Sequence, residues 1–170
     1  MPKILHEPRE NILSAAQTEL REKGVRGFNI RDVAKLSGVA IGTIYNYYGD
    51  KYRLVVEVAK DLFREKIDAI LAEYPEGRGL EEGVASVYEA IRGFKKEHDE
   101  TLKNIFDGAI SGEELAFPKT LELLNKVLES AKKTMLEEEK AFLARAILWA
   151  VLSDNTPLEV LQKVAIALAR

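Results

Sequence analysis

Six side chains that can donate hydrogen bonds occur close together in residues 38–51, which read GVAIGTIYNYYGDK. They are the hydroxyl, amide and ammonium groups of Thr43, Tyr45, Asn46, Tyr47, Tyr48 and Lys51. Donors of these types, with an ammonium among them, suit the negatively charged oxygens of a polyanion. The segment therefore predicts a short helix presented to a polyanion.

A first short helix is expected immediately before this segment, over residues 30–37, because apolar residues there are spaced for one helical face. Asn29 suits its N-cap, since the side-chain oxygen can accept a backbone N–H that the helix leaves unpaired. Asp32, three residues later, resembles a weak capping box. Gly38 can adopt the left-handed conformation that ends the helix and turns the chain.

A second short helix is expected to begin near Ala40, with Val39 buried in the corner between the two helices. At about 100° per residue, Ile44 and Tyr48 fall on one face and should pack inward. The outward positions are Ile41, Thr43, Asn46 and Tyr47, with Tyr45 toward the flank. Gly42 has no side chain, so the backbone there can come close to whatever lies opposite. This pattern predicts a helix-turn-helix.

With these residues in place, the sequence resembles the TetR family of bacterial transcription regulators. The resemblance covers roughly residues 12–54 and rests on Ile12, Ala15, Ala16, Gly24, Phe28, Ile30, Val33, Ala34, Gly38, Val39, Gly42, Thr43, Ile44, Tyr45, Tyr47, Tyr48, Lys51 and Leu54. The sequence departs from the family pattern at Ala40, where a capping serine or threonine is usual, and at Asn29, where threonine is common. Tyr48 stands in place of the usual phenylalanine, so its hydroxyl must find a partner if the ring is buried.

The resemblance implies a division of labour between two groups of residues. Phosphates would be held by Asn29 or its adjacent backbone N–H groups, Thr43, Tyr45, Tyr47 and Lys51. Base edges would be read by Ile41 and Asn46, with Gly42 allowing close approach, and these residue types favour half-sites that contain A·T pairs. Two alternatives stay open, in which Tyr45 is a half-buried anchor of the small domain and Lys51 is a solvated lysine.

The charge is distributed unevenly along the chain. Residues 1–60 contain 10 Lys and Arg against 7 Asp and Glu, a net charge of +3, whereas residues 61–170 contain 15 against 21, a net charge of −6. The whole-chain value of −3 is therefore an average over unlike halves. A basic N-terminal part on an acidic body fits a DNA-facing head, although a head of +3 would bind weakly alone.

The 170 residues include no cysteine, which excludes disulfides, thiolate metal sites and a cysteine nucleophile. The first ten residues, MPKILHEPRE, lack the apolar run of a signal peptide, and no segment approaches the ~18 apolar residues of a membrane span. We therefore expect a soluble, cytoplasmic protein with no membrane partner.

Helical periodicity runs along the chain, without a convincing period-2 strand. We expect an all-α protein of about nine helices, with a helix-turn-helix DNA-binding domain at 1–50 and an effector-binding and dimerisation domain at 51–170. A first helix should run over residues 8–23 with Gly24 as its stop, and a long fourth helix capped by Asp50 should join head to body. The expected breaks and later helices are a loop at 74–79 and helices at 80–96, about 102–110, 118–135, 137–152 and 157–169.

The last two helices carry more apolar surface than a body of this size can cover. Together with the resemblance, this favours a homodimer formed through residues 137–169. The resemblance also implies a repressor of a palindromic operator, released when an unidentified small-molecule effector binds in the body. Candidate pocket residues are Tyr88, Phe94, His98, Phe106, Phe142 and Trp149, with Asn104 as a further polar contact. The competing interpretations are core positions for the aromatics and an exposed position for His98.

Two other classes of protein compete with a regulator. An enzyme is disfavoured because His6 and His98, its two histidines, lie in polar surroundings and the sequence has neither a glycine-rich phosphate loop nor a Glu-x-x-His pair. We expect no catalytic residue, metal site or cofactor. An all-helical adaptor that has lost DNA binding is the second class, because Ala40 lacks the usual cap; only a DNA binder should weaken steeply as salt rises.

Overall fold

The computed structural model describes residues 8–99, 102–103, 112–153 and 156–170, which form helices and their connections without a β-strand. The helices are α1 (Pro8–Gly27), α2 (Ile30–Ser37), α3 (Ile41–Tyr48), α4 (Lys51–Ala72), α5 (Leu80–Glu97), α7 (Gly112–Ser130), α8 (Glu137–Ser153) and α9 (Leu158–Leu168). The expected all-α fold is confirmed, with eight helices in the described residues against about nine expected. The expected helix at 102–110 lies mostly outside the described residues.

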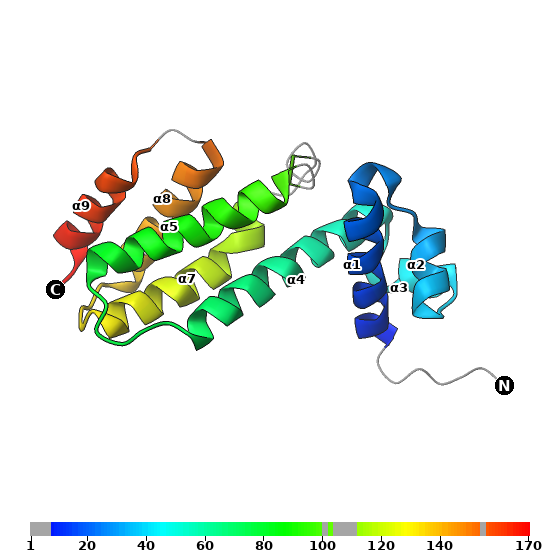
Figure 1. Cartoon of the computed structure of the whole chain (residues 1–170), viewed down its shortest axis with the longest axis horizontal. Coiled ribbons are helices and arrows are strands. Elements are labelled where there is room, and N and C mark those ends of the chain that lie inside the picture. The colour runs from blue at the N-terminus through cyan, green and yellow to red at the C-terminus, as the bar shows by residue number, and fades with distance from the viewer. Residues whose placement is uncertain (1–7, 100–101, 104–111, 154–155) are drawn as a thin grey trace.

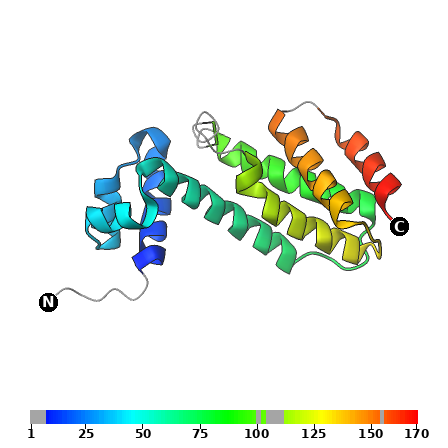
Figure 2. The same ribbon diagram turned by 180° about the vertical axis from the view of Figure 1, so that it is seen from behind.

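The helices form a small head and a larger body that α4 connects (Figure 1). Helices α2 and α3 lie at the end of the molecule farthest from the body, and α9 lies at the opposite end. The reverse view shows α4 running from the head along the body, next to α7 (Figure 2). The short helices of the head are therefore presented away from the body.

Three local signals in the head are confirmed by the backbone. The regular turns of α1 end at Gly24, whose φ of 62° is left-handed, although the helix resumes as far as Gly27. Asn29 is the N-cap of α2, and its Oδ1 accepts a hydrogen bond from the backbone N–H of Arg31 at 2.9 Å. Gly38 ends α2 with a φ of 71°. These positions fix where each short helix starts and stops.

Helix α4 packs against the head at one end and the body at the other. Its N-cap is Asp50, whose Oδ1 accepts a hydrogen bond from the Arg53 backbone N–H at 2.8 Å, as the sequence predicted. The first part of α4 buries Leu54 and Val58 completely, while Ile67 is buried completely in the body. Head and body thus share one continuous helix, so a rotation of α4 carries the head with it.

Helix α7 differs from the prediction at both ends. It begins at Gly112 rather than Pro118, and Pro118 lies inside the helix at an exposed position, where solvent can replace the hydrogen bond that proline cannot donate. It ends at Ser130 rather than Met135, because Lys132 adopts a φ of 52° and the following N–H bonds back to Leu128 O at 2.9 Å. A lysine in the left-handed region gives no sequence signal comparable to glycine.

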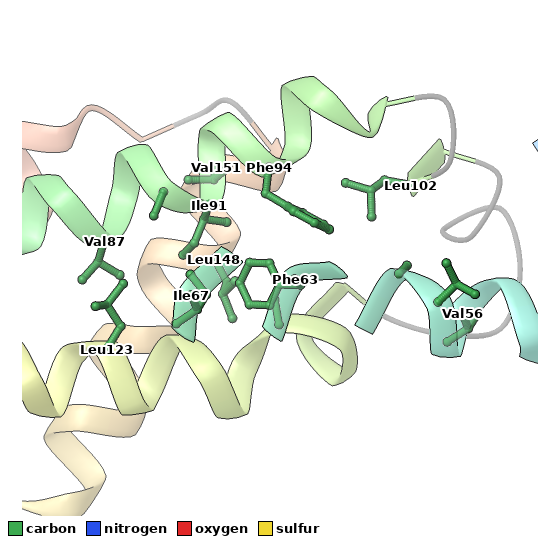
Figure 3. Close-up of a cluster of buried hydrophobic side chains, with 14 of the residues drawn as sticks. Val56, Phe63, Ile67, Val87, Ile91, Phe94, Leu102, Leu123, Leu148 and Val151 are labelled. Atoms are coloured by element: carbon green, nitrogen blue, oxygen red, sulfur yellow. The ribbon is translucent and has the colours of Figure 1, made fainter. Parts of the chain in front are cut away.

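The body is filled by apolar side chains from α4, α5, α7 and α8 (Figure 3). Phe63 on α4 meets Phe94 on α5 edge to face, with ring centres 5.0 Å apart and planes at 76°. Ile67, Ile91 and Leu148 lie beside this pair, all nearly completely buried. Edge-to-face aromatic contacts are favourable, so this pair ties the connecting helix to the body.

Helices α8 and α9 carry exposed apolar side chains on their outer faces, next to the exposed Arg145 and Lys163. Phe142 and Trp149, two turns apart on α8, expose 58% and 59% of their surface. On α9, Val160 and Ile166 expose 46% and 49%. Neither these helices nor any other in the described residues combines the length and apolarity needed to cross a membrane.

Candidate nucleic-acid interface and effector site

Helix α3 is held in the head by two inward side chains, as predicted. Ile44 and Tyr48 expose 1% and 6% of their surface and pack into the head. The Tyr48 hydroxyl donates a hydrogen bond to the backbone oxygen of Arg9 on α1 at 3.2 Å. Burial raises the pKa of Tyr48, while this hydrogen bond acts in the opposite direction. The extra hydroxyl of Tyr48 therefore finds a partner and ties α3 to α1.

The outer face of α3 is centred on Asn46, with Gly42 one turn before it. Apart from its chain neighbours and the backbone of its own helix, a methyl group added at Gly42 would meet no atom of the described residues within 4 Å, so this face is open. The flanking rings of Tyr45 and Tyr47 expose 46% and 51% of their surface. Ile41 is 38% exposed at the start of the helix, and Thr43 is half-buried beside it. The predicted outward set therefore lies on one exposed helix.

The start of α3 has no side-chain cap. Ala40 is its N-cap residue and makes no side-chain hydrogen bond, although its backbone oxygen accepts from the N–H of Thr43 at 2.9 Å. The N–H groups that begin a helix carry the positive end of its dipole. The missing cap leaves this end of α3 suited to an external anion.

Asn29 and Lys51, 22 positions apart in sequence, lie on neighbouring helix starts. The Lys51 ammonium lies 5.8 Å from the centre of the Phe28 ring, next to Asn29 at the start of α2. The Asn29 side-chain oxygen is occupied by the cap, so its NH₂ group is the part suited to an acceptor such as a phosphate. Both side chains are exposed.

Asp32 pairs with Lys23 rather than completing a capping box. The Lys23 ammonium lies 2.6 Å from Asp32 Oδ2 and 3.0 Å from Oε1 of Glu19, whose side chain is 1% exposed. The hydrogen bond with Lys23 lowers the pKa of Asp32, and those with Asp32 and then Glu19 raise the pKa of Lys23. This ion pair joins α1 to α2 and steadies the head.

An open hollow of about 910 Å³ beside α3 contains residues that the sequence did not single out. Arg9, Arg53 and Lys60 line it together with the three tyrosines of α3. Arg9 lies 3.5 Å from Glu57, and Arg53 lies 3.8 Å from Asp50. The helical spacing of Asp50 and Arg53 could have revealed the second pair, whereas no local signal links Arg9 to a residue 48 positions later.

The expected effector residues are not brought together in one place. Phe94 is buried against Phe63, and the His98 ring lies 4.5 Å from the Phe94 ring, so these two do form one corner between α4 and α5. Tyr88 is half-buried against the core, and Phe106 lies outside the described residues. Phe142 and Trp149 require a correction, because their exposed positions on the outer face of α8 separate them from Phe94. Apolarity alone did not distinguish the two faces of α8.

His98 is half-buried rather than an exposed corner residue. Burial holds its pKa below the usual 6.5; Glu97 opposes this shift, while Lys66 on α4 and Arg21 on α1 reinforce it. The Lys66 ammonium also donates to Glu97 at 2.7 Å, which lowers the pKa of that carboxyl. His98 thus lies where head, connecting helix and body meet.

Comparison with known proteins points to the same identity. The family described as bacterial regulatory proteins, tetR family, matches residues 12–58. An uncharacterized HTH-type transcriptional regulator of Bacillus subtilis, YvdT, is 37% identical over 70 residues, and the HTH-type transcriptional repressor KstR2 of Rhodococcus jostii is 30% identical over 87. These matches cover 41% and 49% of this chain, but 36% and 43% of the relatives' own lengths.

Solved structures share the fold over nearly the whole chain. RolR without ligand superimposes with a TM-score of 0.63 at 18% identity, covering 94% of this chain and 90% of RolR. A TetR transcriptional regulator from Rhodococcus sp. RHA1 gives 0.59 at 17% identity, covering 95% and 94%. The head, residues 12–58, therefore matches the tetR family of bacterial regulatory proteins, and the described chain shares its fold with the solved structures.

Proposed function

We propose that this protein is a homodimeric repressor that binds a palindromic operator through α3 and is released by a small molecule. The observation that carries the proposal is the open outer face of α3, centred on Gly42 and Asn46 and seated on the buried Ile44 and Tyr48. A short helix with a polar, exposed face and a fixed inner face fits the major groove of DNA.

Phosphate and base contacts fall to different residues of this face. Lys51 and Asn29, on neighbouring helix starts, would hold phosphates together with Thr43 and the hydroxyls of Tyr45 and Tyr47. Asn46 would pair with an adenine edge, and Ile41 would contact a thymine methyl. Gly42 would let the helix axis approach the groove. The uncapped start of α3 would face a further phosphate.

Dimerisation supplies the affinity that one head lacks. A head with a net charge of +3 neutralises few phosphates, and one short helix reads only a few base pairs. A two-fold pair would place two α3 helices in successive major grooves, about 34 Å apart. The outer face formed by Phe142, Trp149, Val160 and Ile166 is the surface that a second copy would cover.

Release would follow from a movement of α4. The head is fastened to α4 by hydrogen bonds between helices, including Gln17 Nε2 to Asp61 Oδ2 at 2.9 Å. The body holds the other end of α4 through Lys119, whose ammonium donates to Asp68 at 2.6 Å. A ligand that prefers a different α4 position in the body would therefore displace the head as well.

The corner of Phe94 and His98 is the part of the body where such a ligand would act on α4 most directly. RolR has been solved in complex with resorcinol, and an aromatic alcohol could stack on Phe94 and exchange a hydrogen bond with His98. Titration of the DNA complex with resorcinol and related small phenols tests this class of effector. His98→Gln should weaken the release without weakening DNA binding, and phenols that neither release DNA nor raise the melting temperature would exclude the class.

The DNA proposal is tested by selecting bound duplexes from a random pool, which should yield a palindrome. Tyr45→Phe and Lys51→Ala should weaken binding to all duplexes about equally, with Lys51→Ala lowering the salt slope by about 1. Asn46→Ala should relax preference at one position per half-site and cost about 1–3 kcal/mol. Lys126→Ala removes the same charge from the body and serves as the matched control.

Gly42→Leu tests whether operator binding can be lost without a change in the stability of the fold. The added side chain starts in open space, so the melting temperature should stay within a few degrees of the parent while operator binding is lost. Retention of full affinity by this variant would show that α3 does not enter a groove. A protein that retains no duplex at any salt concentration would instead be an adaptor.

A further inference from the structure

The C-terminal residue of the described chain closes a network at the edge of the body. The Arg170 guanidinium donates two hydrogen bonds to the Glu139 carboxylate, Nη1 to Oε2 and Nη2 to Oε1, both at 2.9 Å. The same Oε2 accepts the backbone N–H of Leu136 at 2.7 Å. Arg170 also exchanges both backbone hydrogen bonds with Thr134, at 2.9 and 3.1 Å. We call these four residues the Arg170 clasp.

The clasp joins three segments that are distant in sequence. Arg170 follows α9, Thr134 and Leu136 lie in the connection between α7 and α8, and Glu139 is in the first turn of α8. The paired, fork-shaped contact fixes the direction of approach as well as the distance. Hydrogen bonding to Arg170 and then to the Leu136 N–H lowers the pKa of Glu139, so its carboxylate stays ionised and keeps both partners at neutral pH.

Helix α9 is 11 residues long and packs against α5 and α8. Leu161 and Ala165 are buried, and Leu158, Val164 and Leu168 are partly buried against the core. Gln162 adds one hydrogen bond, from its Nε2 to the backbone oxygen of Glu81 on α5, at 3.0 Å. The clasp adds polar contacts immediately after α9, and these attach the C-terminal end of the helix to the start of α8.

This position matters because the exposed apolar side chains come from two helices. Phe142 and Trp149 come from α8, whereas Val160 and Ile166 come from α9. A second copy can pack against all four only if α9 keeps one place relative to α8. From these contacts we infer that Glu139 and Arg170 are positioning residues for dimerisation, which hold α9 against α8 so that the two helices present one preformed face. This inference rests on the homodimer proposed above.

The first experiment compares dimer dissociation constants by sedimentation. Arg170→Ala and Glu139→Ala should each weaken the dimer about fivefold, the effect of one exposed, well-oriented ion pair. The double variant should be no weaker than either single one, because both remove the same contact. Glu137→Ala is the matched control, since Glu137 pairs with Lys140 in the same turn at 2.6 Å without touching α9. Equal weakening by the control, or no weakening by either clasp variant, would overturn the inference.

The second experiment separates positioning from the ion pair itself. Residues that exchange both backbone hydrogen bonds have Cα atoms about 5.5 Å apart, within the range that a disulfide spans. Because the protein contains no other cysteine, Thr134→Cys with Arg170→Cys can form one defined disulfide. The oxidised variant should dimerise as tightly as the parent although it lacks the guanidinium, and the reduced variant should be about fivefold weaker. Equal dimerisation of the two forms would contradict a positioning role.

The parent protein distinguishes the two proposals. If the parent stays monomeric at every concentration, the homodimer itself is refuted and with it this role of the clasp. If the parent dimerises and the oxidised and reduced variants behave alike, the homodimer stands and the inference about Arg170 fails.

Discussion

The most direct prediction concerns Trp149, which exposes 59% of its surface on α8. A tryptophan carries about 250 Å² of buriable surface, so about 150 Å² is available to a partner. If a second copy covers half of that in each protomer, the dimer removes about 150 Å² from water in total. At about 25 cal/mol per Å², Trp149→Ala should cost the dimer about 4 kcal/mol, or about 500-fold in dissociation constant.

The chain has one tryptophan, so its fluorescence reports this position alone. In the parent protein, the emission maximum should shift to longer wavelength on dilution as the indole becomes exposed, with a midpoint at the dissociation constant. Sedimentation then measures the loss in Trp149→Ala. Tyr47→Ala is the matched control, because it removes a ring exposed to 51% from the head rather than from the body.

The reasoning would be refuted by an emission maximum typical of exposed indole at all concentrations, together with sedimentation of Trp149→Ala indistinguishable from that of the parent. An equal loss of dimer affinity in Tyr47→Ala would also refute it, because non-specific association of exposed aromatic rings would then explain the result.

Three further predictions concern stability. Gly83→Ala should lower the unfolding free energy by about 1–3 kcal/mol in denaturant titrations, because its methyl group would lie 2.2 Å from Val127 Cγ1 between α5 and α7; an unchanged midpoint would show that the helices separate freely. Since the pKa of His98 is lowered in the fold, the unfolded chain binds its proton first, so stability should fall as the pH drops below about 6.5, and His98→Gln should flatten that limb of the pH–stability curve. Lys23→Met should lower the melting temperature by leaving the carboxylate of Glu19 buried without its partner, and adding Glu19→Gln should recover part of the loss; additive losses would contradict the pairing.

The head was predictable to the level of single residues because its signals are local. Asn29, Gly38 and Asp50 set helix ends through their own side chains or backbone freedom, and Ile44 and Tyr48 follow from the 3.6-residue period. The fold class follows from the same periodicity. The roles of the outward residues remain predictions, since they depend on a bound duplex.

The body was less predictable because its signals depend on tertiary or quaternary context. A pattern of apolar residues does not distinguish a side chain in the core from one exposed on the surface, so the sequence alone does not place Phe142 and Trp149. Lys132 ends α7 with a φ of 52°, a conformation that a lysine does not signal in the sequence. The approach of Arg170 to Glu139 spans 31 positions and has no local signature.

Because α4 packs against both head and body, its length sets the orientation of the head relative to the body. Its buried positions fall into two stretches, at residues 54–59 and 63–67, and both must keep their packing contacts. One residue inserted between them would rotate the head by about 100° and advance it about 1.5 Å along the axis. Head and body would each remain folded. In the proposed homodimer, however, the two α3 helices would no longer be aligned with successive major grooves. The length of α4 would therefore contribute to the choice of operator.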